Sequence, residues 1–166
     1  GGDSVAFGPS PLPDRDHRDG KNARQVASWI EERAFGEQPF FIACGFHKPH
    51  VPFRAPREYF DLYPLESVDP EPVPETDWDD IPERARTKRD QAFGFEPGVE
   101  DPALRRAHTR AYQACVSFVD AQIGLLLDAL EQNDLWENTI VILISDHGYQ
   151  LGEHFLWGKV TLFEEC

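Results

Sequence analysis

A run of five consecutive apolar residues at 140–144, Ile-Val-Ile-Leu-Ile, constrains the fold of this chain more than any other feature. A strand with one face in water alternates apolar and polar residues, and this run does not alternate. The pattern is typical of a strand covered on both faces, as in a parallel sheet flanked by helices. A second apolar stretch, residues 39–46, has the same character. The two segments, 39–46 and 139–145, are therefore predicted to be buried strands.

Helical patterns separate these predicted strands. Residues 22–35 carry apolar residues at helical spacing, and Gly36 follows as an end signal. Residues 57–63 form a shorter candidate helix. Asp101-Pro102 is a start signal, with Asp as N-cap and Pro in the first turn, for a helix that runs to about Gln132. Its apolar stripe is Leu104, Ala107, Ala111, Cys115, Phe118, Ile123, Leu126 and Leu130.

The order of these elements predicts an α/β fold, with a central, mostly parallel sheet flanked by helices and joined by right-handed crossovers. Two strands are fewer than the five or six, roughly, of a usual sheet. We therefore expect residues 1–166 to form one domain that is part of a longer one. Residues 61–104 hold 13 Asp and Glu against 4 Lys and Arg. The stretch at about 64–101 is expected to be an acidic, proline-rich excursion, most simply a solvated loop.

Composition narrows the classes of partner. The net charge of −14 argues against nucleic acid as a general partner, because binding it requires local positive charge. No apolar run reaches 18 residues, so no membrane span is predicted. Oligomeric state cannot be inferred from these features.

Each predicted strand is followed by a polar loop that carries histidines. Parallel strands would bring both loops to one edge of the sheet, where ligands of such sheets bind. Four of the six histidines lie in these loops. Imidazoles, lysines and a metal shared by a carboxylate and an imidazole suit the hydrolysis of a sulfate or phosphate ester. The residues concerned are His47, Lys48, His50, Asp146, His147, His154 and Lys159.

Each of these residues also has a simpler interpretation. Asp146 can cap a turn, and His50 can brace the turn between two prolines. Lys48 can be a solvated lysine, and Lys159 can extend over Trp157. Their combination after two predicted strands favours a functional site over these separate explanations.

Three segments together resemble the type I sulfatases of the alkaline phosphatase superfamily, in particular iduronate 2-sulfatase and its bacterial relatives. They are PFFIACGFHKPHVPFRAPREYFDLYP, YQACVSFVDAQIGLLLDAL and TIVILISDHGYQLGEHFLWGKVTLFEE. The resemblance covers residues 22–165 and is weakest at 66–100. It implies hydrolysis of sulfate esters on a small molecule or saccharide, in a periplasmic, secreted or lysosomal compartment.

The resemblance also implies roles for individual residues. Asp146 and His147 would be ligands of a calcium ion. His50 and Lys159 would act on the sulfate group as catalytic residues. Three further residues would line the substrate pocket: His47, Lys48 and His154.

The sequence departs from the family pattern at the nucleophile. Such sulfatases use a formylglycine made from a Cys/Ser-x-Pro-x-Arg motif, and residues 1–166 contain no such motif. The nucleophile, further metal ligands and a C-terminal subdomain are thus expected outside this chain, which alone would be inactive.

Two alternatives remain open at this point. A phosphodiesterase or phosphonate hydrolase of the same superfamily would hold zinc, which suits a histidine ligand better than calcium does. A truncated, non-catalytic relative would only bind an anion or a partner. The nucleophile separates the two enzymes, since formylglycine indicates the sulfatase and Thr or Ser indicates the esterase.

Overall fold

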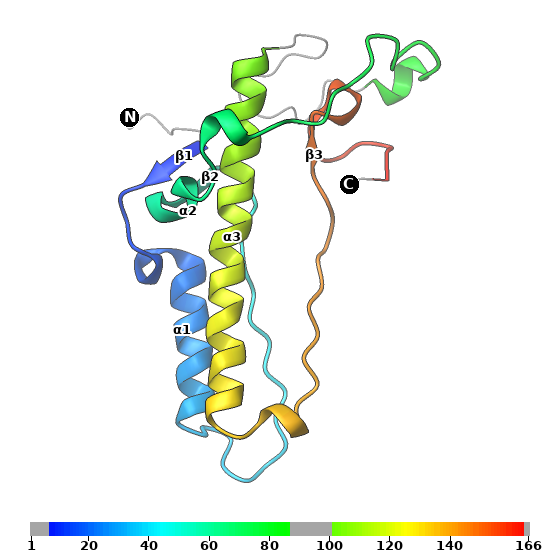
Figure 1. Ribbon diagram of the computed structural model, residues 1–166. Helices are drawn as coiled ribbons and strands as arrows, with labels where there is room; N and C mark the ends of the chain where they lie inside the picture. The colour runs from blue at the N-terminus through cyan, green and yellow to red at the C-terminus, as the bar shows by residue number, and fades with distance from the viewer. Residues whose placement is uncertain (1–6, 87–100, 165–166) are drawn as a thin grey trace, which may run out of the picture. The chain divides into compact units, whose positions relative to one another are not determined.

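The computed structural model describes residues 7–86 and 101–164 (Figure 1). They belong to two compact units, each made of two stretches of chain. Unit 1 comprises Gly1–Pro64 and Ala111–Ile142, and unit 2 comprises Leu65–Arg110 and Leu143–Cys166. The boundary falls within α3 (Pro102–Gln132), the long green-to-yellow helix of Figure 1.

Helix α3 has the bounds that the sequence predicts. Asp101 caps it, because its Oδ1 accepts hydrogen bonds from the backbone N–H groups of Ala103 at 2.9 Å and Leu104 at 3.2 Å. Of the predicted apolar stripe, four residues are buried and the remaining four are half-buried. The buried members are Ala111, Cys115, Phe118 and Leu130.

The length and composition of α3 alone would allow it to cross a membrane, since an 18-residue window has a mean hydropathy of 1.3. Core helices meet the same criterion. In unit 1, Ala129 and Leu130 of α3 form an apolar cluster with Val26, Ala27 and Ile30 of α1. The absence of a membrane span therefore stays a prediction.

Helix α1 (Arg18–Glu31) starts and ends four residues earlier than the prediction of 22–35. It ends early because Arg33 and Gly36 adopt left-handed backbone conformations, with φ of 47° and 60°. At its start the chain enters through a short 3₁₀ helix, η1 (Asp14–Asp16). Gly20 lies so close to the Asp14 carbonyl that no larger residue would fit there.

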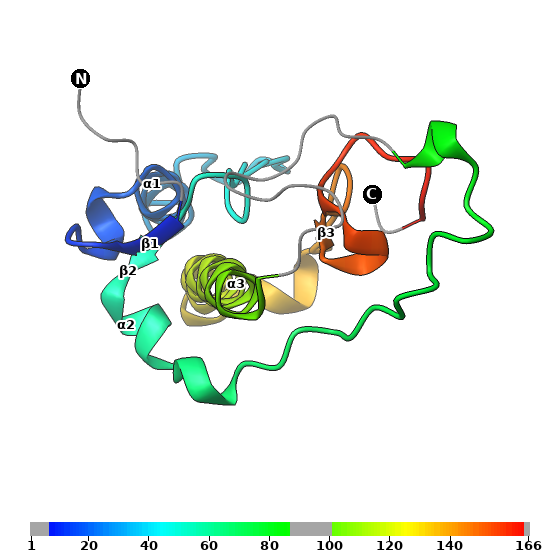
Figure 2. The ribbon, with the colours of Figure 1, turned by 90° about the horizontal axis from the view of Figure 1, so that it is seen from above.

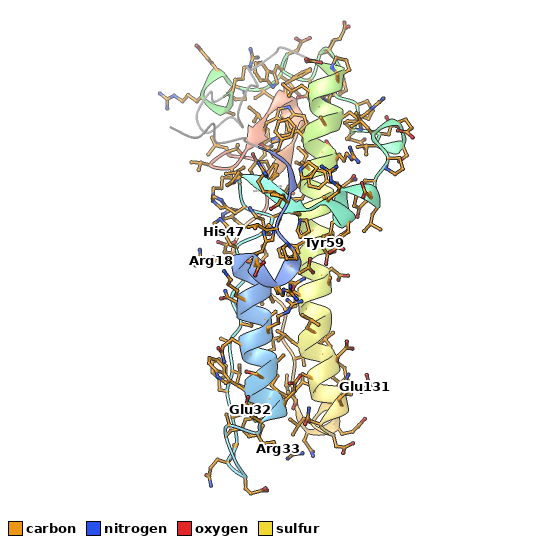
Figure 3. The ribbon with its side chains drawn as sticks, turned by 90° about the vertical axis from the view of Figure 1, so that its left-hand side faces the viewer. Arg18, Glu32, Arg33, His47, Tyr59 and Glu131 are labelled. Carbon is orange, nitrogen blue, oxygen red and sulfur yellow. The ribbon has the colours of Figure 1, made fainter. Side chains whose placement is uncertain are left out.

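Asp14 links three elements of unit 1. Its Oδ2 accepts hydrogen bonds from Tyr59 Oη at 2.5 Å and from Gln122 Nε2 at 2.9 Å. Tyr59 belongs to α2 (Arg57–Asp61), the short helix expected at 57–63, and Gln122 belongs to α3. Figure 3 shows Tyr59 beside α3, near the start of α1. The sequence pattern did not identify this polar node, in which Gln122 is buried and Asp14 and Tyr59 are half-buried.

Unit 1 contains one parallel strand pair, which the sequence did not predict. β1 (Phe7–Ser10) pairs with β2 (Phe53–Pro56), and Phe7 lies opposite Phe53. Phe53 is fully buried and its ring meets Tyr112 edge-on, with centroids 5.3 Å apart. Unit 1 therefore combines a pair of parallel strands with helices. This is a mixed α/β arrangement and agrees with the predicted fold class.

The prediction of strands at 39–46 and 139–145 is wrong for this structure. Both segments run extended, but within the described part of the chain neither pairs with a strand. Phe40, Ile42 and Cys44 pack on the α1–α3 cluster, while Phe41 between them is 94% exposed. A strand needs a neighbour to take up its backbone hydrogen bonds, and an apolar pattern cannot supply one.

Segment 139–145 is also exposed where burial was predicted. The exposed fractions are 89% for Ile140, 77% for Ile142 and 83% for Ile144. Residues with this much apolar surface and unpaired backbone are typical of a sheet edge that can pair with another chain.

Unit 2 is built around a small hairpin. β3 (Gln150–Leu151) pairs antiparallel with β4 (Trp157–Gly158), and between them lies the 3₁₀ turn η5 (Glu153–Phe155). Trp157 is buried, and Leu104, Tyr149 and Leu151 pack against it. Two further 3₁₀ turns, η2 (Leu65–Ser67) and η3 (Glu83–Ala85), belong to the acidic excursion, and a last one, η4 (Trp136–Asn138), follows α3. Residues 87–100 of the excursion lie outside the described residues.

We expect the 166-residue chain, produced alone, to self-associate through its exposed extended segments. Sedimentation velocity over a range of concentrations should show this. Replacing Ile140 and Ile142 together by Lys should reduce the association without changing the helical circular dichroism. The same change at Leu62 and Leu162, which are also exposed, serves as the control. A chain that stays monomeric at every concentration would contradict the prediction.

Candidate functional site

The first histidine loop, residues 47–52, lies at the N-terminal end of α1, where Figure 3 shows His47 near Arg18. Its backbone is held by Asp19, which lies in the first turn of α1 and is only 2% exposed. Asp19 Oδ1 accepts a hydrogen bond from His47 N at 2.9 Å, and Oδ2 accepts one from Lys48 N at 2.8 Å. One buried carboxylate therefore fixes two consecutive peptide groups of the loop.

Lys48 closes the same loop from within. Its ammonium donates hydrogen bonds to the carbonyl of His50, at 2.9 Å, and to the carbonyl of Pro52. Burial lowers the pKa of this lysine. These contacts favour a bracing role for Lys48, and direct binding of substrate by this residue stays a prediction.

The two histidines of the loop lie together, with ring centroids 4.7 Å apart. His50 Nδ1 is 2.7 Å from the Val51 carbonyl oxygen, which can only accept, so Nδ1 is the donor in this contact. Burial lowers the pKa of His47, as do the neighbouring Lys48 and His50. The loop thus presents two adjacent imidazoles, and the pKa of one of them favours its neutral form.

The second loop, in unit 2, brings three predicted site residues together. Lys159 Nζ lies 3.3 Å from His147 Nε2, and this nitrogen lies 3.7 Å from Asp146 Oδ2. His147 Nδ1 contacts the Gly148 carbonyl oxygen at 2.7 Å and therefore carries the ring proton. Nε2 of His147 thus lies near both a carboxylate and an ammonium group.

His154 has a different environment from these three residues. Its Nδ1 lies 2.9 Å from Asp77 Oδ2, and its ring stacks on Phe163 with centroids 4.0 Å apart. Its backbone carbonyl accepts a hydrogen bond from Trp78 Nε1 at 2.7 Å. Asp77 and Trp78 belong to the acidic excursion, so this part of the excursion is anchored and is not simply solvated.

The structure therefore forms two local groups from the seven predicted residues. His47, Lys48 and His50 lie together in unit 1, and Asp146, His147 and Lys159 lie together in unit 2. That both loops share one edge of a sheet stays a prediction. The sequence analysis did not identify Asp19, although an acidic residue in the first turn of a helix could have pointed to it. It also did not identify Asp77 and Trp78, which an aromatic residue within an acidic stretch could have indicated.

Asp146 and His147 fit a metal site in part. A histidine that binds a metal usually donates its other N–H to a carbonyl, as His147 does to Gly148. The side chain of Asp146 is 87% exposed, so its oxygens can be reached from solvent. Calcium takes about six to eight oxygen ligands and zinc about four ligands. Residues 7–86 and 101–164 gather no group of three His, Cys, Asp or Glu that could hold an ion, so further ligands would be needed.

Comparison with known proteins identifies the family. The family model described as Sulfatase matches residues 10–165, and the chain therefore belongs to the sulfatase family. It is similar to a sulfatase of Formosa agariphila, with 42% identity over 86% of this chain and 29% of that protein. It is also 37% identical to the human iduronate 2-sulfatase, over 92% of this chain and 28% of that protein.

A solved structure supports the fold. The crystal structure of the sulfatase-family protein yidJ from Bacteroides fragilis matches 87% of this chain and 28% of its own, with a TM-score of 0.60 and 28% identity. This confirms the predicted α/β fold class and its relation to sulfatases. The chain spans less than a third of the length of each of these relatives.

Replacing Asp19 by Asn should destabilise the protein by about 2 kcal/mol, because an amide oxygen can replace only one of the two charged acceptors of the loop N–H groups. Urea unfolding of the natural gene product would measure the loss. Asp16→Asn, an exposed change of the same kind in η1, is the control. Equal stability of the Asp19 and Asp16 variants would show that the carboxylate does not hold the loop.

Proposed function

We propose that the natural gene product hydrolyses sulfate esters, on a small molecule or a saccharide. Membership of the sulfatase family supports the reaction class. The observation that carries the proposal for this chain is the convergence of Lys159, His147 and Asp146 in one loop. The ammonium group can bind the oxygens of a sulfuryl group. The imidazole and the carboxylate can hold a metal ion that withdraws negative charge from those oxygens.

In this proposal His50 and Lys159 bind the sulfuryl oxygens. A histidine near the leaving group protonates the departing alcohol, a role that requires a protonated imidazole whose pKa lies near the working pH. The contacts of Lys48 with two carbonyls favour its role as a brace of the first loop. His154, which contacts Asp77, is better suited to hold the second loop than to bind sulfate.

Asp146 and His147 would hold a metal ion, calcium by resemblance to the family, together with ligands beyond the described residues. Such an ion would neutralise negative charge on the sulfuryl oxygens. The attacking group would be a formylglycine, which residues 1–166 cannot supply because they lack the motif from which it is made. Peptide mass spectrometry of the natural gene product would find an aldehyde at a Cys/Ser-x-Pro-x-Arg sequence, whereas an unmodified Thr or Ser nucleophile would favour a phosphoester hydrolase.

The phosphoester alternative concerns enzymes of the same superfamily. The chain is 28% identical to a protein of Trinickia caryophylli described as a multifunctional alkaline phosphatase superfamily protein, over 74% of this chain. Parallel assays of sulfate and phosphate release distinguish the two reactions. A product that releases neither group would favour the non-catalytic alternative.

Lys159→Ala should lower turnover of a sulfate ester by about a hundredfold or more, since it removes a charge that acts on the developing negative charge of the transition state. Lys21→Ala, which removes an exposed charge on α1, is the matched control. The melting temperatures of both variants should stay close to that of the parent. Unchanged turnover in the Lys159 variant would rule out its role in binding sulfate.

Calcium should raise the melting temperature of the natural gene product, because an ion that binds only the folded state stabilises it. Asp146→Asn should weaken this effect, whereas Asp120→Asn, at an exposed site on α3, should not. Differential scanning fluorimetry after chelation, followed by addition of calcium or zinc, provides the measurement. Stabilisation by zinc alone would support the two-metal esterase over the calcium enzyme.

A further inference from the structure

The hairpin of unit 2 separates its site residues from its tip. His147 and Lys159 lie just outside the paired residues of β3 and β4, at the open end of the hairpin. His154 lies in η5, at the closed end. The three or four residues between the two ends correspond to about 10 Å at roughly 3.3 Å per residue. A group that binds at Lys159 is therefore separated from the tip by at least the length of one sugar ring.

The tip is clamped by residues of the acidic excursion. Asp77 Oδ2 contacts His154 Nδ1 at 2.9 Å, and both side chains are mostly buried, with 18% and 27% of their surface exposed. Trp78 Nε1 donates to the His154 carbonyl at 2.7 Å, and its ring meets that of Phe155 edge-on at 5.7 Å. Figures 1 and 2 both show the green excursion beside the orange-red hairpin.

The backbone of the tip requires such support. His154 and Phe155 have φ of 54° and 55°, a left-handed conformation that costs about 1–2 kcal/mol for each residue other than glycine. Gly152 before them has φ of 112°, and a side chain there would collide with Arg105 and Trp157. Two consecutive strained residues persist only where surrounding contacts hold them, and the described contacts to His154 and Phe155 come largely from Asp77 and Trp78.

A second contact fixes the excursion further along. Arg105 Nη2, at the start of α3, donates to the Glu71 carbonyl at 2.6 Å. Arg86 packs over the Trp78 ring, with its Cζ 5.8 Å from the ring centroid. Residues 71–86 are thus attached at Glu71 and in the middle, and Arg86 folds back on Trp78 within the segment, although most of their side chains face solvent.

We propose that residues 71–86 form a specificity wall, which contacts the alcohol part of the ester while the sulfate group is held at Lys159. This inference rests on the proposed function. Asp77 and Trp78 are positioning residues, since they act through His154 and do not touch the sulfuryl group. The wall contributes to the binding of a large alcohol group, because such a group reaches the tip of the hairpin. It does not contribute to the binding of a small alcohol group, which does not reach the tip.

The test compares two substrates in the natural gene product: a small aryl sulfate and a sulfated disaccharide. Asp77→Asn and Trp78→Phe should each raise KM for the disaccharide by about tenfold or more, because the wall loses its position. Neither change should alter kcat or KM for the aryl sulfate. Trp78→Phe removes only the indole donor and keeps a ring against Phe155, so it should fold even if Asp77→Asn does not. Asp80→Asn, an exposed change in the same segment, should affect neither substrate.

Tryptic cleavage after Arg84 reports the attachment of the segment without any activity measurement. It should be faster in the Asp77 variant than in the Asp80 variant, and equal rates would overturn the clamp. Equal loss of activity on both substrates would overturn the specificity role and indicate only general support of the loop. If the unsubstituted protein releases sulfate from neither substrate, the proposed function itself fails, and the wall fails with it.

Discussion

Two carboxylates at the start of α1 organise much of unit 1. Asp14 joins the entry to α1 with α2 and α3 through Tyr59 and Gln122, and Asp19 holds the backbone of the first histidine loop. Asp19 is buried, and a buried carboxylate left without donors costs several kcal/mol, whereas Asp14 is half-buried. The donors that the two carboxylates find then fix the positions of segments that lie far apart in the sequence. The histidine loop is thus held by hydrogen bonds from two of its backbone N–H groups to Asp19.

The second loop is held by a different means. Its hairpin has only two residue pairs, and its tip contains strained residues, so contacts from Asp77 and Trp78 complete it. A segment that was expected to be a solvated acidic loop consequently supports the tip of this hairpin. In our proposal the excursion helps to select the substrate, and none of its residues contacts the sulfate group that reacts.

Helix α3 could be predicted to the residue because its start signal, Asp101-Pro102, and its apolar stripe are local. The strands could not, because pairing depends on a neighbour that no local pattern describes. Phe40 and Ile42 find a surface to cover on α1 and α3, whereas Phe41 on the other face finds none. The family resemblance, which rests on the order of short motifs, was confirmed even where the predicted strands were wrong.

For the site, the residue types and their order along the chain were contained in the sequence: His47, Lys48 and His50 in one loop, and Asp146, His147 and Lys159 in the other. Their chemistry follows from side chains that are readable without a structure. Tertiary structure alone decided that Lys159 meets His147, that Lys48 turns back onto carbonyls of its own loop, and that His154 pairs with Asp77. The contact between His154 and Asp77 joins residues 77 positions apart, so its geometry is set by packing and not by any neighbouring residue in the chain.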